Sequence, residues 1–149
     1  MKKIITDSPL GKLVIVEEEG MITEIYATAK EHFISETPLL LDAKRQLEEY
    51  FQKQRKTFDL PLFPKGTPYQ KQVWQELLKI PYGKVATYGE IAKRIGNPLG
   101  ARSVGGACNK NPIMVVIPCH RVIGKTGNLT GYAEGLDKKE LLLKLESDL

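Results

Sequence analysis

A cysteine, a histidine and an arginine stand next to one another at Cys119, His120 and Arg121. They follow the apolar run 113–117 and Pro118, and a short apolar run that ends at a proline is typical of a buried strand that stops there. The thiol is therefore expected at the exit of a strand. Neighbouring cations favour the thiolate, which is the nucleophilic form. Most free cysteines are instead small buried packing residues, so Cys119 is either a nucleophile or part of the core.

A nucleophilic cysteine would also need a base, because a thiol with an ordinary pKa is only slightly ionised at neutral pH. The imidazole of His120 is the nearest candidate in the sequence. Successive side chains of extended backbone point to opposite faces, so direct contact with Cys119 is awkward. A bridging water would connect the two groups.

The composition is that of an ordinary globular protein, with 149 residues, 42% hydrophobic and 27% charged. No apolar run is long enough to span a bilayer. The basic start at residues 1–3 resembles a signal peptide, but Asp7, Pro9 and Lys12 interrupt the apolar stretch that must follow. We therefore expect a cytoplasmic protein without membrane association, in a compartment that keeps a thiol reduced.

Two cysteines and two histidines without CxxC or HExxH spacing predict no metal site. The charge is unevenly distributed: residues 79–125 hold eight Lys or Arg and the single acid Glu90, whereas residues 1–64 hold 9 basic and 11 acidic groups. A basic segment is usually a solvated face. Here it coincides with the reactive cysteine, which favours a polyanion such as DNA.

The chain is expected to form two domains, residues 1–65 and 66–149, because proline and glycine cluster at residues 61–68. Apolar patterns in the first domain predict strands at 11–16 and 21–26 and a helix over 39–53. Residues 58–62 could add a short strand. Nothing in this part has catalytic spacing, so we interpret it as a scaffold.

The second domain reads as mostly helical. Helices are predicted over 68–79, over 88–95 after a capping box at Thr87, and from Pro98 to about 108. The last two form a candidate helix-turn-helix. Its second helix consists mainly of small residues, which would allow close packing against a neighbour or close approach to DNA. Trp74, on the first helix, is expected in the core rather than as a base-stacking platform.

A further helix is expected from an N-cap at Asp137, with leucines at 141–143 and 145 on its apolar face. Glu146 lies one turn after Leu142 and can point inward with that face. A glutamate at the end of a chain is otherwise usually solvated.

The sequence 118–122, Pro-Cys-His-Arg-Val, resembles the active-site signature of the O6-alkylguanine-DNA alkyltransferases. Short motifs on both sides follow the pattern of this family in order; they are residues 67–70, 73–74, 80–83, 87–89, 96–98, 101–107, 111–112, 131–132, 135–136, 139, 142–143 and 146. The resemblance is dense over about residues 66–147, while residues 1–65 match only in general character.

The resemblance implies a catalytic group in which Cys119 accepts the alkyl group through a relay of cysteine, water, His120 and Glu146. Tyr88 matches the tyrosine that contacts the flipped base and helps to protonate it as it leaves. Lys139 matches a lysine near the reactive cysteine.

The same resemblance implies a base pocket and a DNA surface. The pocket residues are Met114, Val122, Tyr132, Ala133 and Lys139. The DNA-binding residues are Arg102, Ala101, Ser103, Gly105, Asn111 and Thr87. Arg102 would fill the space left by the extruded guanine, with a plain phosphate contact as the alternative, and Asn111 would tie the helix-turn-helix to the cysteine segment.

The implied fold is α+β, with a small ribonuclease H-like sheet-and-helix domain followed by a helical domain with a winged-helix-like helix-turn-helix. The implied activity is direct-reversal repair, a single-turnover transfer from O6-alkylguanine, and from O4-alkylthymine, to Cys119. The expected partner is double-stranded DNA, bound in the minor groove with weak sequence preference. Neither a cofactor nor an obligate protein partner is expected, and the protein is expected to be a monomer.

Two positions depart from the family pattern. Glu134 stands where glycine is frequent, and Met114 replaces a proline of some members, so the accepted adduct size stays open. The zinc site of some relatives is not supported, because residues 1–65 contain no cysteine and only His32.

Three functions remain as alternatives to alkyl transfer. They are a non-repairing alkyltransferase-like protein, which Cys119 argues against, a transcriptional regulator, and a cysteine hydrolase.

Overall fold

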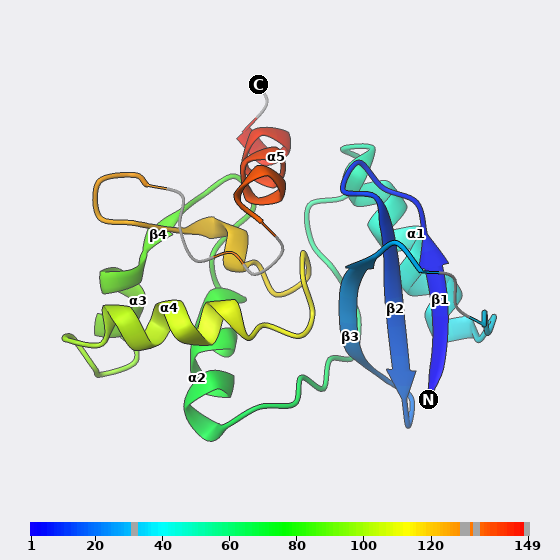
Figure 1. The fold of residues 1–149 in the computed structure, drawn as a ribbon, viewed down its shortest axis with the longest axis horizontal. Helices are drawn as coiled ribbons and strands as arrows, with labels where there is room; N and C mark the ends of the chain where they lie inside the picture. The colour runs from blue at the N-terminus through cyan, green and yellow to red at the C-terminus, as the bar shows by residue number, and fades with distance from the viewer. Residues whose placement is uncertain (31–32, 129–131, 133–134, 148–149) are drawn as a thin grey trace. The chain divides into compact units, whose positions relative to one another are not determined.

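The structure is a computed structural model that describes residues 1–30, 33–128, 132 and 135–147. The chain divides into two compact units (Figure 1). The first contains Met1–Lys65 together with Pro112–Met114, and the second contains Gly66–Asn111 and Val115–Leu149. The short piece 112–114 is thus separated from its sequence neighbours and joins the first unit.

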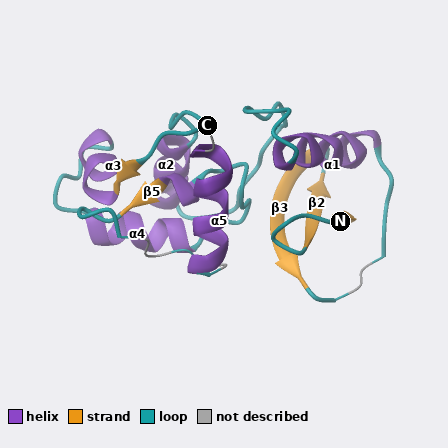
Figure 2. Cartoon of the chain, turned by 90° about the horizontal axis from the view of Figure 1, so that it is seen from above, coloured by secondary structure: helices purple, strands orange, loops and turns teal. Residues whose placement is uncertain are grey.

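The first unit is a three-stranded antiparallel sheet with one helix. Strands β1 (Lys2–Thr6), β2 (Lys12–Glu18) and β3 (Met21–Thr28) lie in the order β1-β2-β3. Helix α1 (Pro38–Phe51) packs against β1 and β2, covering one face of the sheet (Figure 2). Strand β1 was not among the predicted strands. Its only apolar residues are Ile4 and Ile5, which is too short a pattern to predict a strand. The strand forms because its backbone pairs with β2.

Two predicted strands are absent from the described residues. Over 58–62 only Leu62 makes a bridge, to Ile22, since prolines cannot donate to a ladder. The run 113–117 is buried but is not a strand: only Ile113 makes a bridge, to Ile25. The backbone turns immediately afterwards, and Val115 adopts a positive φ of 72°. A short buried run has no periodicity that separates a strand from a buried turn.

The second unit is mostly helical. It contains α2 (Pro68–Leu77), β4 (Ala86–Thr87), α3 (Tyr88–Arg94), α4 (Ala101–Asn109), the 3₁₀ turn η1 (Cys119–Arg121), β5 (Val122–Ile123) and α5 (Leu136–Ser147). Strands β4 and β5 pair in parallel. Trp74 is buried, as predicted, and its indole N–H donates to the carbonyl oxygen of Ala107 at 2.8 Å, joining α2 to α4.

Two helix starts differ from their predicted positions. Helix α4 begins at Ala101 rather than Pro98, because the Gly100 N–H bonds the Asn97 carbonyl oxygen at 2.8 Å and closes a turn first. Helix α5 begins at Leu136, which places Asp137 within the first turn instead of at the N-cap. No helix among the described residues is long and apolar enough to cross a membrane.

Candidate active site

Cys119 opens the 3₁₀ turn η1, directly after Pro118, and is only 4% exposed. Its N–H donates to the carbonyl oxygen of Ile117 at 2.8 Å. The side-chain amide of Asn111 donates to that same carbonyl oxygen at 2.9 Å and to the Cys119 sulfur at 3.2 Å. The end of the α4 segment therefore positions the thiol, and a donor at sulfur favours the thiolate form.

The carboxylate of Glu146 accepts hydrogen bonds on both oxygens. Oε1 accepts from Arg121 Nε at 2.8 Å and from the Gly83 N–H at 3.3 Å, while Oε2 lies 2.7 Å from His120 Nε2 and 2.9 Å from Arg121 Nη2. The glutamate is 6% exposed. Such complete pairing is what allows a carboxylate to stay ionised inside a protein.

His120 is fully buried and neutral at physiological pH. Burial lowers its pKa below the usual 6.5, although Glu146 acts in the opposite direction. Because Glu146 is an acceptor, the hydrogen of the neutral ring belongs on Nε2, and the lone pair belongs on Nδ1. Nδ1 has no hydrogen-bond partner among the described residues. The ring thus presents a proton acceptor on the side away from Glu146.

Arg121 is a buried part of this site. The sequence indicated it as a cation beside Cys119 and as a member of the basic segment, but not as the partner of Glu146. Arg121 is 7% exposed, it forms the two bonds to Glu146, and its Nη1 donates to the Ile80 carbonyl oxygen at 2.7 Å. Its guanidinium carbon lies 5.8 Å from the centre of the Tyr82 ring. A signal was present in the sequence: a buried acid needs a buried cation, and the arginine adjoins the predicted relay.

Helix α5 contributes a second charged group, Lys139, seven residues before Glu146. Its Nζ donates to the Tyr88 hydroxyl at 3.2 Å and lies 5.5 Å from the centre of that ring. Burial lowers the pKa of Lys139, and the two nearby thiols, Cys119 and Cys108, act against this change. The charge of Lys139 therefore interacts with both thiols, and a cation near a thiol favours the thiolate form.

Cys108 has a different environment from Cys119. It lies on α4 and is 1% exposed. Burial, and then the charge of Cys119, raise the pKa of Cys108, with a smaller opposing effect of Lys139. A thiol with a raised pKa stays protonated and is a poor nucleophile.

The helix-turn-helix residues form an exposed surface. Ala101, Arg102 and Ser103 are exposed on α4. The Ser103 hydroxyl lies 2.7 Å from the Tyr69 hydroxyl and donates to the Gly100 carbonyl oxygen at 2.9 Å. Gly105, further along α4, lies beside Tyr88: a β-carbon at this position would be 3.8 Å from the Tyr88 ring.

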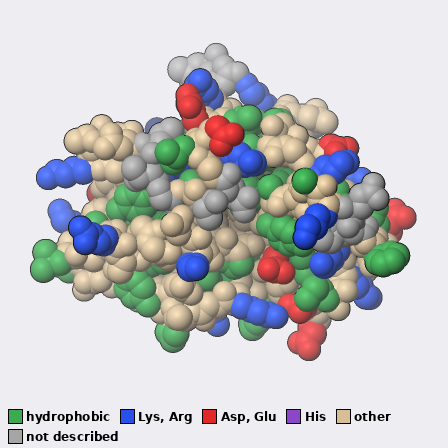
Figure 3. Space-filling view, in the orientation of Figure 1, with side chains coloured by type: hydrophobic (Ala, Val, Ile, Leu, Met, Phe, Trp, Pro, Cys, Tyr) green, Lys and Arg blue, Asp and Glu red, His purple; other side chains and the backbone are tan. Residues whose placement is uncertain are grey.

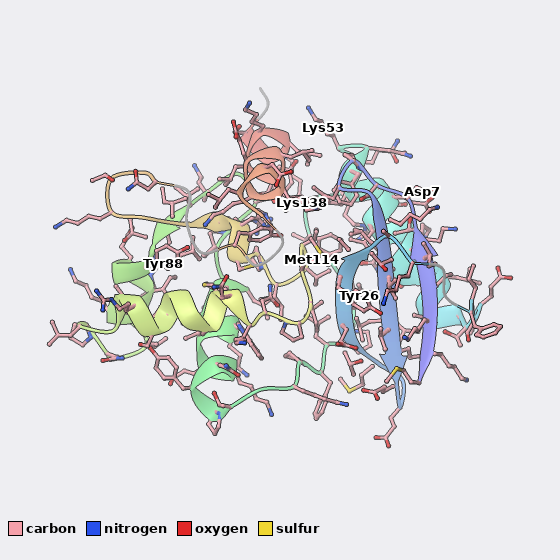
Figure 4. All side chains as sticks on the ribbon, in the orientation of Figure 1. Asp7, Tyr26, Lys53, Tyr88, Met114 and Lys138 are labelled. Carbon is pink, nitrogen blue, oxygen red and sulfur yellow. The ribbon has the colours of Figure 1, made fainter. Side chains whose placement is uncertain are left out.

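Tyr88 begins α3, beside α4 (Figure 4). Thr87 precedes it as the N-cap, and its hydroxyl accepts from the Glu90 N–H at 3.1 Å. The Thr87 hydroxyl, which is expected to contact DNA, therefore also caps α3.

The predicted pocket residues are only partly brought together. Val122 is fully buried in β5, where it pairs with Ala86, and Tyr132 is 7% exposed. Met114 is 2% exposed and belongs to the first unit, where its N–H donates to Ile25. Ala133 and Glu134 lie outside the described residues.

One basic residue of the segment 79–125 is not exposed on the surface. Of the eight Lys and Arg residues in 79–125, Arg121 is buried and paired, and the other seven are exposed. Blue side chains protrude from the second unit in Figure 3. Within the described ranges no group of three or more His, Cys, Asp or Glu side chains could hold a metal ion.

Both units match known protein families. Residues 1–64 match the ribonuclease-like domain of 6-O-methylguanine DNA methyltransferase, and residues 68–148 match the DNA binding domain of 6-O-methylguanine DNA methyltransferase.

Individual relatives extend over nearly the whole chain. A methylated-DNA–protein-cysteine methyltransferase of Methanosarcina acetivorans is 49% identical over 149 residues, covering 95% of this chain and 96% of its own. A constitutive methylated-DNA–protein-cysteine methyltransferase of Bacillus subtilis is 46% identical, covering 94% of this chain and 92% of its own. The crystal structure of Mycobacterium tuberculosis OGT in complex with DNA is 41% identical, with a TM-score of 0.90, covering 99% of this chain and 93% of that one.

Proposed function

The chain belongs to the 6-O-methylguanine DNA methyltransferase family, and from this premise we propose that it repairs O6-alkylguanine in DNA by transferring the alkyl group to Cys119. The observation that carries the proposal is the buried contact between His120 and Glu146, 2.7 Å long, beside a cysteine that accepts a hydrogen bond from Asn111. O4-alkylthymine, which presents a similar alkylated oxygen, is the proposed second substrate.

In the proposed relay, the Cys119 proton passes through a water to Nδ1 of His120. That nitrogen is suited to accept it, because Nε2 is engaged with Glu146. The resulting imidazolium is stabilised by the carboxylate, as in other acid–base triads. Glu146 keeps its charge because Arg121 binds both of its oxygens.

The thiolate then attacks the alkyl carbon and forms a carbon–sulfur bond. The bond between that carbon and O6 breaks, and its electron pair leaves with guanine. Tyr88 donates its hydroxyl proton to the leaving base, and Lys139, 3.2 Å away, stabilises the remaining phenolate charge. The product on Cys119 is a thioether, which no neighbouring group can hydrolyse, so each molecule acts once. The chemistry requires no cofactor.

The reaction requires the base to leave the duplex, and unstacking costs a few kcal/mol. We assign the filling of the vacated space to Arg102, which is exposed on α4. The small neighbours Ala101, Ser103 and Gly105 would allow this helix into the minor groove, where few side chains can read the bases. The seven exposed cations of the basic segment would bind the phosphates of DNA, and phosphate contacts carry little sequence preference.

The remaining assignments follow from the same proposal. Residues 66–149 would form the DNA-binding and alkyl-transfer domain, apart from 112–114, which belong to the first unit, and residues 1–65 would form its scaffold. Thr87 and Asn111 would support the DNA surface, and the extruded base would lie among Val122, Tyr132 and Lys139. We propose a monomer that works in the cytoplasm, where Cys119 stays reduced.

Mass spectrometry after incubation with duplex DNA containing O6-methylguanine tests the function. The expected result is a permanent gain of about 14 Da on the peptide that contains Cys119, with one methyl group transferred per protein. Cys119→Ala should bind DNA without any gain in mass, whereas Cys108→Ala, the matched control, should react like the wild type. Binding without a mass change in the wild type would indicate a non-repairing protein, and repeated turnover of unmodified protein would indicate a hydrolase.

A further inference from the structure

Leu99 is the most exposed large apolar side chain in the described part of the second unit. It is 97% exposed, compared with 51% for Val85, 49% for Leu136 and 45% for Leu78. Single exposed leucines are common on protein surfaces. Exposure alone therefore indicates nothing, but the backbone that presents Leu99 and the charges around it do.

The turn of residues 97–100 holds Leu99 in a defined position between α3 and α4. The Gly100 N–H donates to the Asn97 carbonyl oxygen at 2.8 Å, which leaves Pro98 and Leu99 at the two corners. Proline fixes its own φ. A β-carbon at Gly100 would lie 3.0 Å from the Asn97 carbonyl oxygen and closer still to the Asn97 side-chain amide, so a larger residue there would have to displace that side chain.

Side chains from two helices anchor the same turn. The side-chain amide of Asn97 donates to the Tyr69 hydroxyl on α2 at 3.3 Å, and this hydroxyl lies 2.7 Å from the Ser103 hydroxyl on α4. The turn is thereby connected to the surface that we assign to DNA. A leucine at the corner of an anchored turn forgoes the stabilisation of burial in the free protein, and it regains it when a partner covers the turn.

The charges around Leu99 indicate the kind of partner. Lys93 and Arg94 are exposed at the end of α3, and Arg102 is exposed three residues after Leu99. No acidic residue occurs in the sequence between Glu90 and Glu134. An exposed apolar side chain with exposed cations on both sides of it in the sequence is complementary to a groove of duplex DNA, where the carbon atoms of the sugars lie between two rows of phosphates.

We propose that Leu99 packs against the deoxyribose rings of duplex DNA, next to the position where Arg102 enters the groove. This inference rests on the proposed function and adds to it a contact whose contribution does not depend on salt. The cations of the basic segment supply the salt-dependent part of the affinity, and Leu99 supplies an apolar part.

The test measures duplex binding by fluorescence anisotropy at a series of salt concentrations. For Leu99→Ala we expect binding about three- to tenfold weaker at every concentration, with the same slope of log affinity against log salt, because only apolar surface is lost. Leu99→Lys should bind more tightly than Leu99→Ala at low salt, and its slope should be steeper by about 0.9, as one added phosphate contact requires. Leu41→Ala, at an exposed leucine of α1, is the matched control and should bind like the wild type.

Affinity of Leu99→Ala within twofold of the wild type at every salt concentration would overturn the inference and leave Leu99 to a protein partner. A changed slope for this variant would also overturn it. Reaction with the free base O6-benzylguanine needs no DNA and should be unchanged in Leu99→Ala; slower reaction would place Leu99 in the support of the active site instead. Failure of the proposed function is distinct, because the wild type would then bind duplex DNA without modification of Cys119.

Discussion

Arg121 and Glu146, twenty-five residues apart, form a buried two-bond ion pair, with Nε 2.8 Å from one carboxylate oxygen and Nη2 2.9 Å from the other. The pair joins the turn that begins with Cys119 to the last helix. Gly83 closes the group by donating to the same carboxylate, and its positive φ of 78° is a conformation that suits glycine. The partner of His120 is thus held in place from two sides.

Removing the arginine should destabilise the protein strongly, because the carboxylate of Glu146 would remain buried without its cation. For Arg121→Met we expect a loss of about 3–5 kcal/mol in the free energy of unfolding, measured by denaturant titration. The exposed pair of Glu140 and Lys144 provides the control: Glu140→Gln should change stability by less than about 0.5 kcal/mol. Equal effects of the two substitutions would mean that the buried pair contributes no more than a surface pair.

Glu146→Gln should slow alkyl transfer by about 100-fold, the usual contribution of a positioned acid–base group. The amide keeps the shape of the side chain but no longer stabilises an imidazolium at His120. Single-turnover rates on duplex DNA measure the change, with anisotropy as a check on binding. The final yield should remain one alkyl group per protein, and an unchanged rate with saturating DNA would contradict the relay.

Stability should fall as the solution becomes acidic, because the pKa of His120 is lowered in the folded protein. Above the ordinary pKa of about 6.5, the histidine is neutral in both states and the full stability is present. Below it the unfolded chain binds a proton that the folded protein does not, so stability is lost progressively until the pH falls through the lowered pKa. Denaturant titrations of the wild type and His120→Gln between pH 7 and pH 5, a range of about two units around this value, should show a shallower slope for the variant.

Lys139→Met should slow transfer without loss of stability. Burial lowers the pKa of this lysine, so its charge is unfavourable to folding, and an unbranched apolar side chain fits the same space. The ammonium beside Tyr88 and the thiols would be lost, and with it the support for charge during transfer. Rates with O6-benzylguanine and thermal midpoints test this, with Lys138→Met on the same helix as the control. A large fall in the thermal midpoint would instead assign Lys139 a mainly structural role.

Arg102→Ala should slow the repair of duplex DNA at least about tenfold, because extrusion of the base would lose its replacement in the stack. The reaction with O6-benzylguanine requires no extrusion and should keep its rate. Arg102→Lys should restore little, since an ammonium lacks the planar surface of guanidinium. Equal slowing on both substrates would assign Arg102 to support of the pocket.

The sequence by itself predicted each of the helices α1 to α5 and indicated the family, although α4 and α5 begin two or three residues away from their predicted starts. The helices capped by Thr37, Thr67 and Thr87 begin within a residue of their predicted positions. Of these caps only Thr87 was predicted from the sequence, and capping can be predicted because it is a local interaction between neighbouring backbone and side-chain atoms. The order of motifs around Cys119 indicated the family for a similar reason, since each motif is a short contiguous stretch.

Only the tertiary structure decided how the charges of the site are paired and how the buried run before it is folded. The sequence predicted Arg121 as a cation beside Cys119 and within a basic segment, but its pairing with Glu146 arises only where α5 packs against the cysteine turn. The sequence predicted a strand over 113–117, but the backbone turns at Val115. Both outcomes depend on contacts between residues far apart in the chain. Hydrophobicity and local periodicity carry no information about which distant partner a buried group will meet.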